Sequence, residues 1–381
     1  NLARHCLAKE TPAQRAKTAL CVIADAAEPP AEIWNYDALE RAVLNVCGAL
    51  QKSGLERGDR LLIRLDNTSA YPIVFLGAIA AGLIPIPAST QLTDAEAEFL
   101  IEDSGATALA ARRAAGSKKV RFHFDADDVA RMIANGPPAP YADTRAEDPA
   151  YIIYTSGTTA RPKGVVHAQR VILGRAPMYQ GWYAITAADR VLHAGAFNWT
   201  YTLGTGLLDP WANGATSLIF TGEKTPTVWP ELIRTTGATI LAAVPSLIRQ
   251  ILKYAPEGPI DLGHLRHALI AGERPPEDLF DAWANRTGTA LHEALGMSEL
   301  STYISTAPGI ERPAGATGSA QPGRRIAILS ESDDDGDEPL PPGEPGLIAI
   351  HRSDPGLMLG YWNRPNEESE VYRGQWFVGG D

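Results

Sequence analysis

The sequence has 381 residues, of which 45% are apolar and 21% charged, and its formal net charge is −11 at pH 7. This length exceeds one ordinary domain, and the composition is that of a folded protein with more than one substantial core. The acidic balance excludes a basic surface of the kind that binds nucleic acid or anionic membranes.

The few cysteines predict reduced thiols in a cytoplasmic protein, because Cys6, Cys21 and Cys47 show no C-x-x-C spacing. The eight histidines form no H-x-x-x-H metal pattern. Charged residues such as Arg4 and Lys9 fall where the apolar core of a signal peptide would lie, so no signal peptide is expected.

The first part of the chain predicts alternating helices and strands. Residues 36–52 have apolar side chains at helical spacing and predict an amphipathic helix, and residues 60–65 predict a strand. Thr93 and Glu96 form a capping-box signature that opens another helix, and residues 107–110 predict the next strand.

The run from Tyr71 to Ala88 carries no charge and is long enough to suggest a membrane span. Pro85 and Pro87, with Gly77 and Gly82 inside the run, argue against a spanning helix. We predict instead a buried helix that ends near Gly82 and a buried strand over residues 83–87.

The pattern weakens over residues 111–149, and residues 136–148 predict an exposed connection to a distinctive stretch, Tyr151 to Val165. This stretch begins as an apolar strand and becomes rich in glycine and hydroxyl groups before Lys163, as suits a polyanion. The candidate phosphate ligands are Thr155, Ser156, Gly157, Thr158, Thr159 and Lys163. It is not a Walker P-loop, because Lys163 precedes Gly164 with no Ser or Thr following, and its composition alone would equally fit a solvated loop.

Beyond this loop, short apolar strands alternate with helices, which predicts mainly parallel α/β layers. The predicted strands are 191–194, 216–220, 239–244, 267–270 and 290–292, with helices at 227–235 and 245–253. From about residue 314 the pattern changes to short strands and turns, with a predicted pair at 324–329 and 346–351, and suggests a small β-barrel-like subdomain. The acidic run 332–338 predicts a solvated hairpin tip, because Gly336 comes too early for a Ca²⁺ loop.

Several of these stretches together resemble the adenylate-forming superfamily of acyl- and aryl-CoA ligases, peptide-synthetase adenylation domains and luciferases. Residues 154–165 match its phosphate loop except at Ala160, where the family has glycine, and residues 294–299 are similar to its Y-G-x-T-E element. Residues 270–275 resemble its adenine-side loop, and residues 376–381 resemble W-F-x-T-G-D. Further matches at 315–318, 346–349 and 357–362 are taken as structural.

The resemblance implies an α/β fold of the acyl-CoA synthetase type. Its expected parts are a first α/β subdomain over 1–190 that includes the phosphate loop, a second over 191–313 with the acyl and adenine pockets, and the barrel-like part over 314–381. The chain ends where the family's small C-terminal domain is expected to begin, so it is expected to bind ATP or acyl-AMP but to adenylate poorly.

The resemblance also implies roles for single residues. Glu299 is expected to bind Mg²⁺ with the nucleotide phosphates, Ser298 to donate to the α-phosphate, and Thr158 to take part in catalysis. Asp381 is expected to bind the ribose hydroxyls. The remaining expected nucleotide ligands are Ala271, Gly272, Glu273, Glu293, Ala294, Leu295, Gly296 and Met297.

The expected acid pocket is mostly apolar and aromatic, which favours an aromatic, cyclic or medium-chain acid. Its candidate residues are His193, Phe197, Asn198, Trp199, Tyr201, Gly296 and Tyr303. The match to the family leaves open whether His193 or Trp199 faces the acid, because two alignments of this segment are possible.

The leading hypothesis is an AMP-forming carboxylic acid–CoA ligase that uses ATP, Mg²⁺ and CoA. A substrate carboxylate would attack the α-phosphate of ATP and release pyrophosphate, after which the CoA thiol would displace AMP. The alternatives are an adenylation domain that loads a carrier protein, and a catalytically silent nucleotide-binding module.

Overall fold

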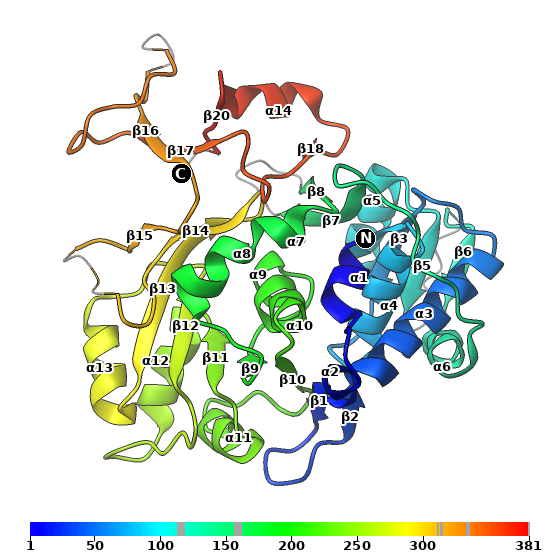
Figure 1. The fold of residues 1–381 in the computed structure, drawn as a ribbon, viewed down its shortest axis with the longest axis horizontal. Coiled ribbons are helices and arrows are strands. Elements are labelled where there is room, and N and C mark those ends of the chain that lie inside the picture. Colours follow the sequence, from blue (N-terminus) through cyan, green and yellow to red (C-terminus); the bar gives the residue numbers. More distant parts are fainter. Residues whose placement is uncertain (113–118, 156–161, 311, 313–314, 333–335, 380–381) are drawn as a thin grey trace.

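The computed structural model describes residues 1–112, 119–155, 162–310, 312, 315–332 and 336–379 (Figure 1). A mainly parallel sheet and a second, parallel sheet make up most of the molecule with their helices, and smaller sheets join them and cover one end. This arrangement confirms the predicted layered, mainly parallel α/β fold.

The larger sheet has nine strands in the order β15-β14-β13-β12-β11-β9-β10-β1-β2. Its inner pairs, from β1–β10 to β12–β13, are parallel, and antiparallel pairs lie at both ends. The strands are β1 (Thr18–Ile23), β2 (Glu32–Asn35), β9 (Arg190–His193), β10 (Thr216–Phe220), β11 (Ile240–Ala243), β12 (His267–Ala271), β13 (Ala290–Met297), β14 (Ser301–Ser305) and β15 (Ser319–Ala320).

Helices cover both faces of this sheet because its strands alternate apolar side chains that are buried on either side. On one face, Trp229 and Trp283 pack with Leu241 beneath α11 (Val228–Thr236), α12 (Pro245–Tyr254) and α13 (Asp278–Thr287). On the other face, Trp182 packs with Ala242 and Leu269. The elements around that face are α8 (Ala176–Met178), η1 (Tyr179–Tyr183), α9 (Thr200–Leu203), η2 (Gly204–Leu208) and α10 (Asp209–Ala212).

The second parallel sheet has the order β4-β3-β5-β6 and lies at the opposite end of the molecule (Figure 1). Its strands are β3 (Arg60–Arg64), β4 (Ile84–Pro87), β5 (Ala108–Ala111) and β6 (Phe122–Phe124), and the helices around it are α3 (Tyr36–Lys52), α4 (Ala70–Ala80), α5 (Asp94–Ser104) and α6 (Ala126–Asn135). Every residue of α4 after Ala70 is buried in the protein core, which confirms the buried helix predicted there. No helix in the described ranges is long and apolar enough to cross a membrane.

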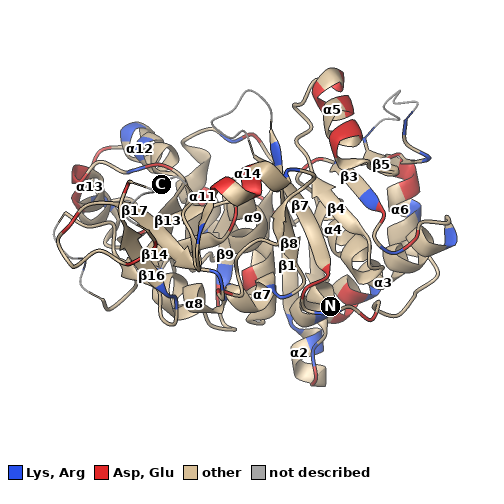
Figure 2. Ribbon diagram, turned by 90° about the horizontal axis from the view of Figure 1, so that it is seen from above, with Lys and Arg blue, Asp and Glu red and all other residues tan. Residues whose placement is uncertain are grey.

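A small sheet of β7 (Pro149–Thr155), β8 (Lys163–Ala168) and β18 (Gly360–Tyr361) lies between the larger layers and is followed by α7 (Val171–Gly174). At the N-terminus, α1 (Leu2–Leu7) packs against α4 and α10, and α2 (Pro12–Ala16) leads into β1. Figure 2 shows acidic residues along α5 and along α14 (Pro365–Glu370), in keeping with the negative net charge.

The C-terminal strands form an open four-stranded sheet in the order β16-β17-β20-β19. They are β16 (Ile326–Leu329), β17 (Leu347–His351), β19 (Tyr372–Arg373) and β20 (Trp376–Phe377). The predicted β pair is confirmed, but the expected barrel-like shape is wrong for the described strands, since β16 and β19 are edges that do not pair with each other. Residues 333–335 of the predicted hairpin tip lie outside the described residues.

Hydrogen-bonded sheets cross the segment limits expected from the sequence. β1 and β2 join strands from beyond residue 190, and β18 joins the hairpin of β7 and β8. The N-terminal strands therefore complete the larger sheet, whereas the C-terminal segment adds a strand to the hairpin of the predicted phosphate loop.

Two buried ion pairs connect elements that are far apart in the sequence. Arg175 makes a two-pronged contact with Asp209 at 2.6 and 2.7 Å and also donates to the Ser301 hydroxyl at 2.8 Å. Arg324 contacts Asp354 at 2.8 and 2.9 Å. All four charged side chains are at most 5% exposed, so each pair replaces solvent with paired hydrogen bonds.

Candidate active site

The hairpin of β7 and β8 carries the predicted phosphate loop. Thr155 and Lys163 are the last pair in its antiparallel register, so they mark the two ends of the loop. Ser156, Gly157, Thr158 and Thr159 lie outside the described residues, as does Ala160. The structure therefore places the ends of the predicted loop beside each other, above a buried apolar strand.

Lys163 is held by two neighbours from the C-terminal segment. Its ammonium lies 2.6 Å from a carboxylate oxygen of Glu367 in α14, and 5.3 Å from the centre of the Tyr361 ring. Only 20% of the lysine side chain is exposed, so these contacts are partly shielded from water.

The turn from β13 to β14 carries Ser298 and Glu299. An added Cβ on Gly296 would lie 2.7 Å from the carbonyl oxygen of Ser301 and 2.8 Å from the Cα of Thr302, so the two strands approach too closely for a side chain there. Ser301 adopts a φ of 92°, a conformation that is unusual for a residue with a side chain, and the buried Arg175 bonds its hydroxyl.

Glu299 is half-buried at this turn and is bonded to the segment before α14. One of its carboxylate oxygens accepts a hydrogen bond from the Tyr361 hydroxyl at 2.8 Å, and its carbonyl accepts one from the Met358 amide at 2.8 Å. Burial and the negative charge of Glu299 raise the pKa of Tyr361, which keeps the hydroxyl a hydrogen-bond donor.

A cavity of about 700 Å³ joins the loop ends to the turn. Thr155, Pro162 and Ser298 line one part of it, and Asn198 and Trp199 line another. The remaining lining is mostly apolar and comes from β4, the segment after it, α5 and β7; it includes Ala88, Phe99, Leu100 and Ile153, and also the acidic Glu96. The structure thus brings predicted phosphate-side and acid-side residues to one cavity.

A neighbouring cavity of about 550 Å³ shares Asn198 and Trp199 with the first and is lined by more polar groups, among them Asn67, Gln91 and Lys224. Asn67 fixes the segment before Trp199, because its amide donates to the Gly195 carbonyl at 3.1 Å and accepts from the Phe197 amide at 3.3 Å. Trp199 is 66% exposed and lines both cavities.

The other aromatic residues predicted for the acid pocket pack in cores. Phe197 is buried against Tyr71, and Tyr303 is fully buried in the apolar cluster beside the C-terminal sheet. The Tyr201 hydroxyl lies 3.2 Å from each of two backbone carbonyls, of Ala243 and Leu269. None of these three side chains lines the cavities around Trp199.

His193 lies at the end of β9, edge-on to Tyr201 at 4.5 Å. Its Nδ1 accepts a hydrogen bond from the Gly195 amide at 3.0 Å, so the proton of the neutral ring is on Nε2. That Nε2 is buried without a hydrogen-bond partner in the described structure, and burial lowers the pKa of the ring to about 3. His193 is therefore a neutral, buried ring beside the site.

The expected adenine-side residues lie at the carboxyl ends of two neighbouring parallel strands. Ala271 ends β12 opposite Ala294 of β13, and Gly272 follows with a φ of 97°. Glu273 accepts a hydrogen bond from the Ser246 amide at 2.7 Å, which caps the first turn of α12. This contact gives Glu273 a structural role that does not depend on an adenine base.

Of the other expected nucleotide ligands, Glu293 is buried, and burial raises its pKa although Arg312 lies 3.5 Å away. Leu295 and Met297 pack beside the C-terminal cluster. An added Cβ on Gly379 would lie 3.1 Å from the Met297 sulfur, so the described end of the chain lies beside β13. Asp381 lies outside the described residues.

Two residues at the centre of this arrangement are absent from the prediction. Tyr361 and Glu367 contact Glu299 and Lys163, yet the stretch around Tyr361 is predicted as structural and Glu367 stands in an ordinary acidic helix. Their contacts span 62 residues and more along the chain, so no local pattern marks them.

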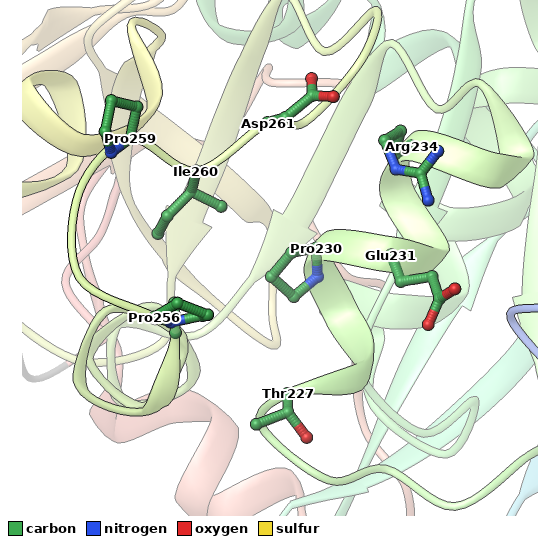
Figure 3. A pocket seen from close by; sticks show the side chains of 9 residues that line it. Thr227, Pro230, Glu231, Arg234, Pro256, Pro259, Ile260 and Asp261 are labelled. Carbon is green, nitrogen blue, oxygen red and sulfur yellow. The ribbon is translucent and has the colours of Figure 1, made fainter.

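A further pocket of about 290 Å³ lies between α11 and residues 255–261, where three prolines surround it (Figure 3). It shares no residue with the cavities around Trp199.

Comparison with known proteins gives a consistent result. The sequence profile of the family described as AMP-binding enzyme matches residues 9–362. Benzoate–CoA ligase of Thauera aromatica is 31% identical over 375 residues, which covers 91% of this chain and 68% of that protein. 3-Hydroxybenzoate–CoA ligase of Aromatoleum sp. (strain CIB) is 27% identical over 364 residues, with the same two coverages, 91% and 68%.

Solved structures agree with the fold. A benzoate CoA ligase from Burkholderia xenovorans LB400 superposes with a TM-score of 0.86 at 25% identity, covering 100% of this chain and 77% of that one. Apo MatB from Rhodopseudomonas palustris superposes with a TM-score of 0.88 at 23% identity, covering 100% and 75%.

Proposed function

Because the chain belongs to the family of AMP-binding enzymes, we propose that it is an AMP-forming acid–CoA ligase that activates an apolar carboxylic acid with ATP. The 31% identical benzoate–CoA ligase and the 27% identical 3-hydroxybenzoate–CoA ligase support this reaction class. CoA is the acceptor thiol in the proposal.

The observation that carries the proposal is the cavity at which Thr155, Ser298 and Trp199 meet. A phosphate-binding loop and an acid pocket must open onto one space for a carboxylate to reach the α-phosphorus. Lys163 and Glu299 directly follow the lining residues Pro162 and Ser298 in the sequence, and both contact Tyr361.

In the first step, a carboxylate oxygen of the acid forms a bond to the α-phosphorus of ATP, and the bond to the pyrophosphate oxygen breaks. The products are an acyl-adenylate and pyrophosphate. In the second step, the CoA sulfur attacks the acyl carbon, the thiol proton is lost, and AMP leaves with the bonding electrons. Positioning and charge neutralisation dominate such chemistry, and in this proposal Lys163 and the Ser298 hydroxyl supply both.

Glu299 suits Mg²⁺ binding together with a nucleotide. No group of three or more His, Cys, Asp or Glu side chains suited to a metal occurs within the described ranges, so a fully protein-bound ion does not fit. Mg²⁺ usually takes one or two carboxylates and fills its other positions with phosphate oxygens and water, which a single half-buried glutamate allows. When bound, the ion would neutralise charge on the phosphates.

An aromatic or similarly apolar acid fits the cavity best. Phe99, Leu100 and Ile153 line it together with Trp199, and its acidic residue, Glu96, accepts hydrogen bonds from Thr93 in a capping box. The benzoate and hydroxybenzoate ligases among the relatives act on acids of this kind.

Calorimetric titration with sulfamoyl analogues of acyl-adenylates tests the proposal on the chain itself. We expect the benzoyl analogue to bind at least about tenfold more tightly than the acetyl analogue, because it buries one more apolar ring. Trp199→Ala should reduce this preference, whereas Tyr254→Ala, an exposed aromatic on α12, should leave it unchanged.

Pyrophosphate exchange and thioester formation separate the alternatives. Exchange with benzoate that consumes CoA supports the ligase. Exchange without CoA consumption would favour an adenylation domain that loads a carrier protein, and no binding of any adenylate analogue would refute the proposed function.

A further inference from the structure

We propose that Tyr361 is a positioning residue that holds Glu299 and Lys163 in place for the nucleotide phosphates and their metal. This inference rests on the proposed function, and it assigns a task to a side chain that contacts both expected ligands. Tyr361 contacts these two residues and need not touch the nucleotide itself.

The two ends of the tyrosine contact different groups. The hydroxyl donates to Oε1 of Glu299 at 2.8 Å, and the ring centre lies 5.3 Å from the ammonium of Lys163. A carboxylate has lone pairs for several partners, so a hydrogen bond at one oxygen orients the group without using its capacity to bind a metal. The ring, in turn, favours an ammonium ion over its face.

Tyr361 is well placed for this task because its own position is fixed. It pairs with Val165 in the β18–β8 ladder, and the neighbouring Leu359 and Trp362 amides donate to Val166 at 2.8 Å and Gly164 at 2.7 Å. Its side chain is only 7% exposed and belongs to the apolar cluster that includes Phe377. The strand that carries the phosphate loop therefore also holds the tyrosine.

Lys163 has a second support, which allows the two contacts of Tyr361 to be separated. Glu367 lies 2.6 Å from the lysine ammonium, and Arg364 supports this region through an ion pair with Asp103 at 2.6 Å. Loss of the tyrosine hydroxyl should therefore leave Lys163 in place and free only the Glu299 carboxylate.

The test compares Tyr361→Phe, which loses only the hydroxyl, with Tyr361→Leu, which loses the ring as well. The dissociation constant of ATP is measured by calorimetry on the 381-residue chain, once with excess Mg²⁺ and once in EDTA. Tyr372→Phe is the matched control, because Tyr372 packs in the same cluster and its described ring contacts are with Phe377 and Arg352.

We expect Tyr361→Phe to weaken MgATP binding about tenfold, the usual effect of losing a hydrogen bond to a charged group, with little change in EDTA. Tyr361→Leu should weaken binding in both conditions, and Tyr372→Phe in neither. Thermal unfolding of each variant shows whether the fold is kept. The ratio of the ATP dissociation constants with Mg²⁺ and in EDTA does not depend on the amount of folded protein.

Two outcomes would contradict the proposal in different ways. Suppose that the wild-type chain binds MgATP, and that the affinity of Tyr361→Phe is unchanged or falls by the same factor with and without Mg²⁺. The positioning role is then refuted, while the proposed function stands. A wild-type chain that binds no ATP in either condition would refute the proposed function together with this inference.

Discussion

Because Gly296 has no side chain, β13 and β14 approach each other closely at the turn that carries Ser298 and Glu299. The nearest atoms to an added Cβ belong to the backbone of Ser301 and Thr302, at 2.7 and 2.8 Å, and backbone cannot rotate away as a side chain can. An alanine there would push β13 and β14 apart.

We therefore expect Gly296→Ala to lower the free energy of unfolding by about 1–3 kcal/mol and to weaken MgATP binding. Urea unfolding and calorimetry measure the two effects. Gly258→Ala is the control, because Gly258 has a φ of 94° but no atom within 4 Å of the added Cβ, so it tests backbone strain without the clash. Unchanged MgATP affinity in Gly296→Ala would show that the turn tolerates the displacement.

At the scale of single residues, the sequence predicts those that a local pattern marks. Thr93 and Glu96 form the expected capping box, with hydrogen bonds between each backbone amide and the other's side chain. Tyr361 has no such mark, because its partner Glu299 is 62 residues away and only the fold brings them together.

At the scale of elements, Arg175, which lies between α7 and α8, connects Asp209 of α10 with Ser301, the first residue of β14. Tyr183 also donates to Asp209 at 2.6 Å, and Arg175 reaches the hydroxyl of Ser301. Removal of one partner would leave an uncompensated charge that is 1% exposed.

Asp209→Ala is expected to lower the free energy of unfolding by about 3–5 kcal/mol, because no carboxylate then compensates for the desolvation of the buried Arg175 guanidinium. Asp37→Ala serves as the control: its ion pair with Arg41 is exposed on α3 and should contribute less than about 1 kcal/mol. Chemical denaturation of both variants measures the difference, and equal losses would show that the buried pair has no special weight.

Elements with strong periodicity are also predicted well. The helix of residues 36–52 has the expected bounds, since Asn35 caps it and its apolar residues share one face. The strand β1 is not predicted, because its parallel partner β10 lies almost 200 residues further along and a short apolar run does not reveal a partner. The open C-terminal sheet differs from the expected barrel-like shape for the same reason, since closure depends on long-range pairing.

At the scale of the whole molecule, four histidines are buried in the neutral form. Burial lowers the pKa of His167 and His193 to about 3, and that of His267 and His292 to about 4. In the unfolded chain these rings have a pKa of about 6.5, so the unfolded state binds more protons between these values. The contribution of these histidines to the free energy of unfolding is therefore fully present above about pH 6.5 and is lost as the pH falls through their folded-state pKa values of about 4 and about 3.

We expect the free energy of unfolding to fall with pH in this range by up to about 1.4 kcal/mol per pH unit for each histidine. Urea unfolding at about pH 7.5, 6.5 and 5.5, on both sides of the pKa of about 6.5 of a free histidine, checks the slope. His193→Gln should flatten it, whereas His264→Gln, at an exposed position, should not. A slope that both variants share with the wild type would show that carboxylates, not buried histidines, cause the acid sensitivity.

The ion pair between Lys163 and Glu367 has a consequence for how an anion arrives at the loop. The lysine already carries an internal counterion at 2.6 Å, so an incoming phosphate exchanges one anion for another. Such an exchange neutralises no bare charge, and the affinity should depend on ionic strength less steeply than it would for a solvated lysine. The Glu367 carboxylate that such a phosphate would displace belongs to α14, so filling of the loop should alter the contacts of this helix.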